Sequence, residues 1–224
     1  MQAARVRATV STVTQGDDFL VRFWGVRGSI ACPGPATARY GGNTSSIEVR
    51  CAGRLILFDA GTGIRNLGSA LLAEAPLDAD LFFTHTHFDH VCGLPFFKPF
   101  FQPQSSFRLW AGHLGGRMTL HGVMRGLMMA PLFPVPPEVF KARMEYRDFA
   151  AGETLTPAPG ITLRTAALNH PDGATGYRIE HGGRSLCYIT DTEHVPGAPD
   201  ANVLSLIAGA DLVIYDCMYT DEEY

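Results

Sequence analysis

Apolar residues occur along this chain in short runs that are bounded by glycine, proline, asparagine or aspartate. Runs of this length and composition predict β-strands more often than long helices. Two turn signals, Ala52-Gly53 and His181-Gly182-Gly183, predict hairpins between neighbouring strands. The predicted strands are residues 19–24, 46–51, 54–58, 79–84, 107–111, 143–147, 161–167, 175–180, 185–190 and 211–215.

Helical spacing of apolar residues is confined to a few stretches. It predicts helices over residues 64–73, 115–130 and 198–209, and a short helix after His90. Strands come first as hairpins and then alternate with helices, so we expect an α+β fold of two packed sheets with helices outside. Residues 25–43 are rich in glycine and proline and predict a long loop of the kind that carries function. We expect residues 1–18 to be a lead-in to one domain over 19–224.

Composition restricts the class of protein. The chain has 224 residues, of which 46% are hydrophobic and 18% charged, which is typical of a globular core. No apolar run reaches the roughly 18 residues that span a bilayer, and no apolar stretch follows Arg5 and Arg7 as in a secretory signal. The five cysteines form no C-x-x-C pair, which favours reduced thiols and a cytoplasmic location.

Charge is unevenly distributed along the chain. The formal net charge is −4, yet residues 185–224 carry eight acidic residues and no lysine or arginine. Binding to nucleic acid normally requires a basic stripe that neutralises phosphates. This acidic segment therefore argues against nucleic acid as a partner, and it favours a small molecule.

The densest chemistry lies in His85-Thr86-His87-Phe88-Asp89-His90, directly after the predicted strand 79–84. Imidazole and carboxylate groups together suit zinc, with manganese or iron as alternatives. In an extended segment His85 and His87 point to the same side, so they can share one ion, whereas Asp89 and His90 face a second position. Buried side by side without partners, these groups would be costly in an ordinary core.

Two further polar residues follow predicted strands and are candidates to complete the cluster. His170 follows the strand 161–167, and Asp191 follows the strand 185–190. Either could be an ordinary turn residue, but four ligands cannot fill two metal positions. The predicted metal ligands are His85, His87, Asp89, His90, His170 and Asp191.

These motifs resemble those of the metallo-β-lactamase-fold hydrolases, in the branch that includes ribonuclease Z and cyclic-phosphate phosphodiesterases. The resemblance extends from about Phe23 to Tyr224 and implies a four-layer αββα sandwich with two divalent ions. It implies that Asp59, in Phe58-Asp59-Ala60-Gly61-Thr62-Gly63, is a buried carboxylate that orients a ligand histidine. It also implies that Asp191 bridges the two ions and that Asp216 takes an acidic motif position.

One expected motif has no counterpart. The family carries a further histidine that completes the second metal site, and no histidine follows His194 in this sequence. We therefore expect a chain that lacks the final strand and helix unit, with Asp89, His90, Asp191 and water at a weakly occupied second position. Replacement of the missing ligand by His194 is the alternative.

The resemblance implies hydrolysis of a phosphodiester through a metal-bound hydroxide, with a small substrate such as a cyclic nucleotide. Asp89 would orient the nucleophile, and His194 or Asp216 would protonate the leaving group. Arg27 and Asn43, on or beside the glycine-rich loop, are candidate substrate contacts or ordinary loop residues. The alternatives are a β-lactamase or lactonase, a diiron redox protein and a non-catalytic metal-binding scaffold; a homodimer also stays open.

Overall fold

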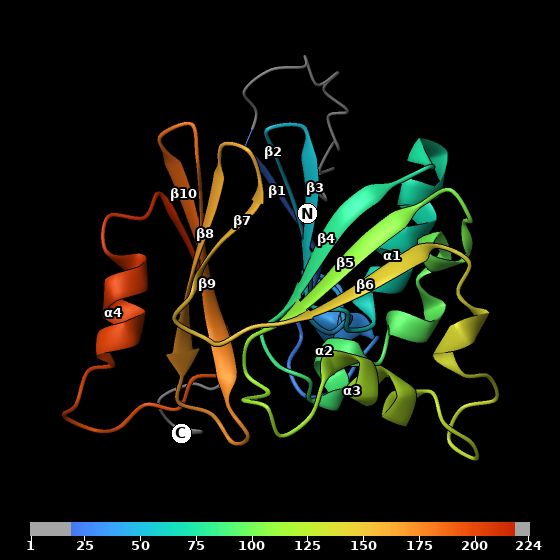
Figure 1. Cartoon of the computed structure of the whole chain (residues 1–224). Helices are drawn as coiled ribbons and strands as arrows, with labels where there is room; N and C mark the ends of the chain where they lie inside the picture. The colour runs from blue at the N-terminus through green and yellow to red at the C-terminus, as the bar shows by residue number, and fades with distance from the viewer. Residues whose placement is uncertain (1–18, 218–224) are drawn as a thin grey trace, which may run out of the picture.

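The computed structural model describes residues 19–217, which form two β-sheets packed face to face with helices on both outer sides (Figure 1). The predicted αββα architecture is therefore correct. The predicted lead-in, residues 1–18, and the last residues, 218–224, lie outside the described part of the chain.

The first sheet has six strands in the order β1-β2-β3-β4-β5-β6. They are β1 Leu20–Gly25, β2 Ser46–Cys51, β3 Arg54–Phe58, β4 Asp78–Phe83, β5 Ser106–Ala111 and β6 Arg143–Asp148. The hairpin β2–β3 turns at Ala52 and Gly53, which both have positive φ, as the sequence predicted. From β3 to β6 neighbouring strands are parallel, so their carboxyl ends lie at one edge.

The second sheet has five strands in the order β11-β10-β9-β8-β7. They are β7 Thr154–Ala158, β8 Ile161–Leu168, β9 Ala174–His181, β10 Arg184–Ile189 and β11 Leu212–Tyr215. Strand β7 was not predicted, because Pro157 and alternating threonines give it no apolar pattern. Strands β8 and β10 are both antiparallel to β9, and β11 is parallel to β10, so the carboxyl ends of β8, β10 and β11 also share one edge.

The helices are shorter than the sequence predicted. They are α1 Gly63–Leu71, α2 Phe88–Val91, α3 Leu120–Leu127 and α4 Ala201–Ile207, with short 3₁₀ turns at Pro35–Thr37, Leu72–Glu74, Leu94–Phe96, Lys98–Phe101 and Pro137–Val139. The short helix expected after His90 instead begins at Phe88, inside the histidine motif. No helix in the described range is long and apolar enough to cross a membrane.

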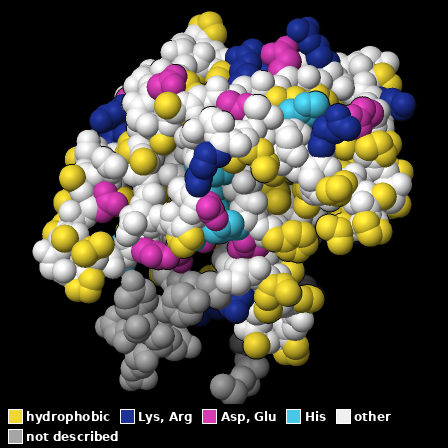
Figure 2. Space-filling view, turned by 60° about the horizontal axis from the view of Figure 1, so that its bottom comes forward, with side chains coloured by type: hydrophobic (Ala, Val, Ile, Leu, Met, Phe, Trp, Pro, Cys, Tyr) yellow, Lys and Arg dark blue, Asp and Glu magenta, His cyan; other side chains and the backbone are white. Residues whose placement is uncertain are grey.

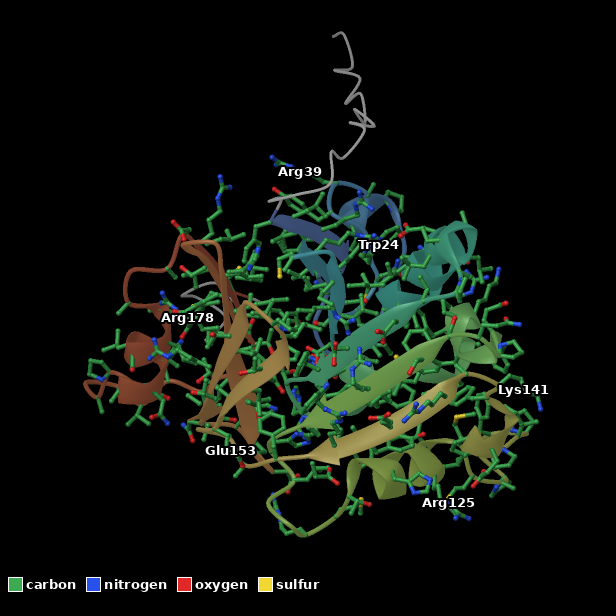
Figure 3. The ribbon with its side chains drawn as sticks, turned by 45° about the horizontal axis from the view of Figure 1, so that its top comes forward. Trp24, Arg39, Arg125, Lys141, Glu153 and Arg178 are labelled. Carbon is green, nitrogen blue, oxygen red and sulfur yellow. The ribbon has the colours of Figure 1, made fainter. Side chains whose placement is uncertain are left out.

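Three apolar clusters hold the four layers together. One lies between the first sheet and α1 to α3, a second between the two sheets, and a third between the second sheet and α4. Phe97 and Phe100, from the phenylalanine-rich turn after α2, are fully buried in the first cluster. Figure 3 shows Arg178 beside α4, where its Nη1 donates to the carbonyls of Leu206 and Ala208 at the end of that helix.

Two tyrosines from the second sheet cross to the first. The buried Tyr177 hydroxyl donates to the Phe83 carbonyl at 2.6 Å, and the Tyr188 hydroxyl donates to the Asp59 carboxylate at 3.0 Å. Buried hydroxyls need partners, so each bond fixes how the sheets dock. Both bonds lie near the edge at which the carboxyl ends of the strands meet, because Phe83 ends β4 and Asp59 follows β3.

Candidate metal centre

The predicted ligands converge at the common edge of the two sheets. Asp59 follows β3 and the motif 85–90 follows β4, while His170 and Asp191 follow β8 and β10 of the second sheet. Open α/β folds place their sites at the carboxyl ends of parallel strands for the same topological reason. Figure 2 views the molecule from this side and shows histidine and acidic side chains exposed near its centre.

Two groups of ligand atoms form there, and each has its atoms within 4.8 Å of one another. The first contains His85, His87 and His170, and the second contains His85, His90 and Asp191. The sequence had divided the motif into two separate halves. In the structure the buried His85 ring lies close to both His87 and His90 and is a member of both groups.

Asp89 lies beside the second group without being one of its three members. Its Oδ2 is 3.5 Å from His90 Nε2 and accepts the backbone N–H of Ser29 at 2.8 Å. The glycine-rich loop 25–43 is thereby fixed to the motif. Sequence reasoning missed this contact because a backbone amide has no side-chain signature.

The buried Asp59 carboxylate orients the motif from behind. It accepts His90 Nδ1–H at 2.9 Å, the backbone N–H of Thr84 at 2.8 Å and the Tyr188 hydroxyl at 3.0 Å. This leaves His90 Nε2 facing Asp191 at 3.2 Å. The arrangement is the carboxylate–histidine pair that fixes tautomer and ring orientation in metal sites, in the role predicted for Asp59.

Close backbone packing sets the position of the turn after β3 against the motif. Ala60 donates to the His90 carbonyl at 2.7 Å, and Gly93 donates to the Ala60 carbonyl at 2.9 Å. A Cβ at Gly61 would lie 2.3 Å from the Asp89 carbonyl oxygen, so only glycine fits there. Ser29, Asp59 and Asp191 are three of the five described non-glycine residues with positive φ, a conformation that is often retained at functional sites.

The electrostatics around His90 favour positive charge. Burial lowers the pKa of His90, but the carboxylates of Asp59 and Asp191 outweigh burial and hold it well above its usual value. Burial raises the pKa of Asp191. The hydrogen bond from His90 and the positive charge of His90 outweigh burial, however, and hold the pKa of Asp191 at about 2. The position therefore attracts a cation, whether a proton or a metal ion.

His85 has the opposite character. Burial, together with the charge of His90, lowers its pKa to about 2, so its ring is neutral. Its Nε2 is buried and has no hydrogen-bond partner within residues 19–217, while its Nδ1 lies 3.2 Å from the Thr84 hydroxyl. A buried imidazole nitrogen without a partner is costly unless it ligates. These donors therefore fit divalent ions of the zinc, manganese or iron type.

His113, two residues after β5, lies next to the histidine motif, a contact that the sequence did not reveal. Its Nε2 lies 3.0 Å from the Thr86 hydroxyl, and burial lowers the pKa of His113 to about 4. A lone histidine after a strand is usually a turn residue, so only the parallel pairing of β4 and β5 exposes its link to the motif.

The remaining predicted residues lie around the second group. A cavity of about 490 Å³ borders Asp191 and is also lined by Arg27, Tyr215 and Asp216. The His194 ring stacks parallel to Tyr215, with His194 Nε2 3.4 Å from the Tyr215 hydroxyl. Asn43 lies apart from the cavity lining, and its side-chain oxygen accepts the Thr62 hydroxyl at 3.2 Å.

Comparisons with known proteins agree with this geometry. Residues 54–224 match the family model described as the β-lactamase superfamily domain. A ribonuclease Z of Haloarcula marismortui is 28% identical over 166 residues, which cover 73% of this chain and 48% of the relative. The chain thus spans about half the length of that relative.

Solved structures show the same fold. The metallo-β-lactamase fold protein YhfI from Bacillus subtilis superposes with a TM-score of 0.61 and 17% identity, over 88% of this chain and 70% of that chain. A diphosphatase of the PhnP family superposes with a TM-score of 0.58 and 20% identity, over 86% of this chain and 71% of that chain. With its αββα fold and clustered histidine motif, the chain belongs to the β-lactamase superfamily, and its sequence is similar to ribonuclease Z, as its motifs predicted.

Proposed function

We propose that this protein hydrolyses a small phosphodiester, using two divalent ions held by the two ligand groups that share His85. The observation that carries the proposal is the convergence of two adjacent ligand groups, His85, His87 and His170 beside His85, His90 and Asp191, because such adjacent groups can hold two ions close together, with the free Nε2 of His85 ligating one of them. When bound, such ions polarise phosphoryl oxygens and lower the pKa of water. Similarity to ribonuclease Z supports a phosphodiester over a lactam or lactone.

The chain's own residues would arrange the reacting groups. His87 and His170 complete the first position, with His170 Nε2 3.0 Å from His87 Nδ1, and His90 and Asp191 complete the second. Asp89, held by the Ser29 amide, would accept a proton from the attacking water and orient it. His194 and Asp216 stay the candidates to protonate the leaving group, because both follow strands that end at this edge.

A small substrate is favoured over RNA by charge. In the described part of the second sheet after Arg184, the chain carries acidic residues and no lysine or arginine. Arg27, which lines the cavity, is the candidate contact for a single phosphate. Because the Asn43 side-chain oxygen accepts the Thr62 hydroxyl, any contact of Asn43 with the substrate would come from its amide nitrogen. A cyclic nucleotide has the single negative charge that this limited basic surface suits.

The proposal is tested by turnover of a substrate panel with zinc, manganese or iron added. We expect the protein to cleave bis(p-nitrophenyl) phosphate and 2′,3′-cyclic AMP in preference to a β-lactam or an acyl-homoserine lactone. His85→Ala should abolish that activity, with His181→Ala, a half-buried histidine at the end of β9, as the matched control. Preference for the lactam or lactone, or equal inactivity of all variants with metal bound, would refute the phosphodiesterase.

A further inference from the structure

Two large apolar side chains stand in solvent on either side of Asp89. Phe88 is 70% exposed and directly precedes Asp89, and Ile30 is 67% exposed and directly follows Ser29, whose amide holds Asp89. Single exposed hydrophobic residues are common on protein surfaces. Here, however, both flank the same proposed ligand, although they are 58 positions apart in the sequence.

The backbone holds both side chains in place. Phe88 begins α2, where its carbonyl accepts the Cys92 amide at 2.8 Å and the His87 carbonyl accepts the His90 amide at 3.0 Å. The Ile30 amide donates to the Gly28 carbonyl at 2.7 Å. Both residues therefore lie in hydrogen-bonded turns next to the contact between the Ser29 amide and Asp89.

Further apolar side chains are exposed on this face of the molecule. Figure 2 shows hydrophobic side chains gathered beside the histidine and acidic groups at the centre of this face. Phe96, 52% exposed, belongs to the 3₁₀ turn just after α2, and its ring meets Phe133 edge to face at 5.9 Å. A substrate group that lies here would lose water from a hydrophobic surface, which favours an apolar or aromatic group.

The basic residues at this edge have other roles: Arg27 and Arg39 line the cavity beside Asp191, where Arg27 is the candidate phosphate contact. Arg117 donates to the Asp172 carbonyl at 2.8 Å and its guanidinium is 3.7 Å from the Asp172 carboxylate, so it serves the loop that carries His170. Asp89 and Asp191 are acidic. Specificity beyond the phosphoryl group must therefore come largely from apolar contact.

We propose that Phe88 and Ile30 form a subsite for an aromatic ring on the ester group that the phosphodiester retains. The inference rests on the proposed phosphodiesterase function and adds its substrate class: diesters that carry an aryl group or a nucleobase. The Phe88 ring would stack on or meet the substrate ring edge to face, and Ile30 would cover its other side. This pair determines specificity and takes no part in the chemical step.

The test uses three diesters with one leaving group. Methyl, p-nitrophenyl and thymidine-5′ esters of p-nitrophenyl phosphate all release p-nitrophenolate and differ only in the group that is retained. We expect the wild-type kcat/KM to favour the two aromatic diesters over the methyl diester. Phe88→Ser and Ile30→Ser should each lower that preference about fivefold, the effect of a partly lost aromatic contact. Because the readout is a ratio within one variant, a general loss of activity cancels.

Controls separate the subsite from general damage. Leu204→Ser removes an apolar side chain that is 52% exposed on α4, on the outer side of the second sheet, and should leave the ratio unchanged. Phe88→Leu keeps an apolar side chain without the ring and should retain part of the preference. Comparing the p-nitrophenyl and thymidine diesters then tells whether the subsite favours an aryl ester or a nucleoside.

The outcomes are distinguishable from failure of the function itself. Cleavage of all three diesters with a ratio that Phe88→Ser and Ile30→Ser do not change would overturn the subsite and leave the phosphodiesterase intact. If no diester is cleaved, the subsite is tested by binding instead. NMR saturation transfer compares how tightly the protein binds diphenyl phosphate and dimethyl phosphate. Tighter binding of diphenyl phosphate that both variants weaken supports the subsite, and equal binding overturns it.

Discussion

The two sheets contribute to the metal centre in different ways. The first sheet supplies His85, His87, Asp89 and His90 from one short segment, and all but the half-buried His87 are less than 10% exposed. The second sheet supplies His170 and Asp191 from separate loops, where both residues are only half-buried. One side of the site is thus rigid before an ion arrives, and the other depends on the docking of the sheets. Substitutions on the two sides should therefore fail in different ways.

The largest effect should come from His85→Ala. Because His85 is a member of both ligand groups, its loss should weaken metal binding more than the loss of any other ligand and lower kcat/KM by roughly a thousandfold or more, given the several kcal/mol that metal ions contribute. His170→Ala, on the second sheet, should retain an ion in the group of His85, His90 and Asp191. Metal analysis by mass spectrometry after gel filtration measures both. Equal metal loss in the two variants would disprove the sharing of His85.

Asp59→Asn should give the next largest effect. The asparagine tolerates the positive φ of 56° but has one accepting oxygen and no charge, so it cannot accept the Thr84 N–H on one oxygen and both His90 Nδ1–H and the Tyr188 hydroxyl on the other, as the carboxylate does. Metal affinity should fall about 10- to 100-fold, the usual cost of losing such a partner. Competition with a fluorescent chelator measures this affinity.

Tyr188→Phe provides the matched comparison for Asp59→Asn. It removes only one of the hydrogen bonds to Asp59, and that bond comes from the second sheet. Its loss of metal affinity should be smaller than that of Asp59→Asn. A loss as large would mean that sheet docking, and not the carboxylate, orients His90.

Tyr177→Phe should lower stability while sparing the ligands. It leaves the buried Phe83 carbonyl without its donor, which costs about 1–3 kcal/mol in the free energy of unfolding. Urea denaturation of the metal-free protein measures this cost. Unchanged stability together with lost metal binding would show that the bond between Tyr177 and Phe83 supports the metal ligands and does not hold the two sheets together.

The smallest effect should come from Arg117→Ala. The exposed pair with Asp172 contributes about 0–1 kcal/mol, as most surface ion pairs do, although it lies on the loop after His170. Metal affinity should change less than threefold. A tenfold loss would show that the second-sheet side is held more tightly than its exposure indicates.

The same contrast explains what the sequence could reveal. The motif 85–90 was identified because four candidate ligands are contiguous in the sequence. His170 and Asp191 were inferred from their positions after predicted strands and from the number of ligands that two ions need. The role of Asp59 needed the resemblance, since a single polar residue after a strand has no signature of its own. The sharing of His85, the Ser29 amide and the approach of His113 arise only from three-dimensional packing. They could not be read from periodicity or spacing.

The hydrogen bond between Tyr188 and Asp59 joins residues that are 129 positions apart. During synthesis on a ribosome the histidine motif leaves the exit tunnel roughly one hundred residues before Asp191 does. The nascent chain therefore presents a half-built set of strong ligands for several seconds, at about 5–20 residues per second. The full set of proposed ligands therefore exists only once residue 191 has been synthesised.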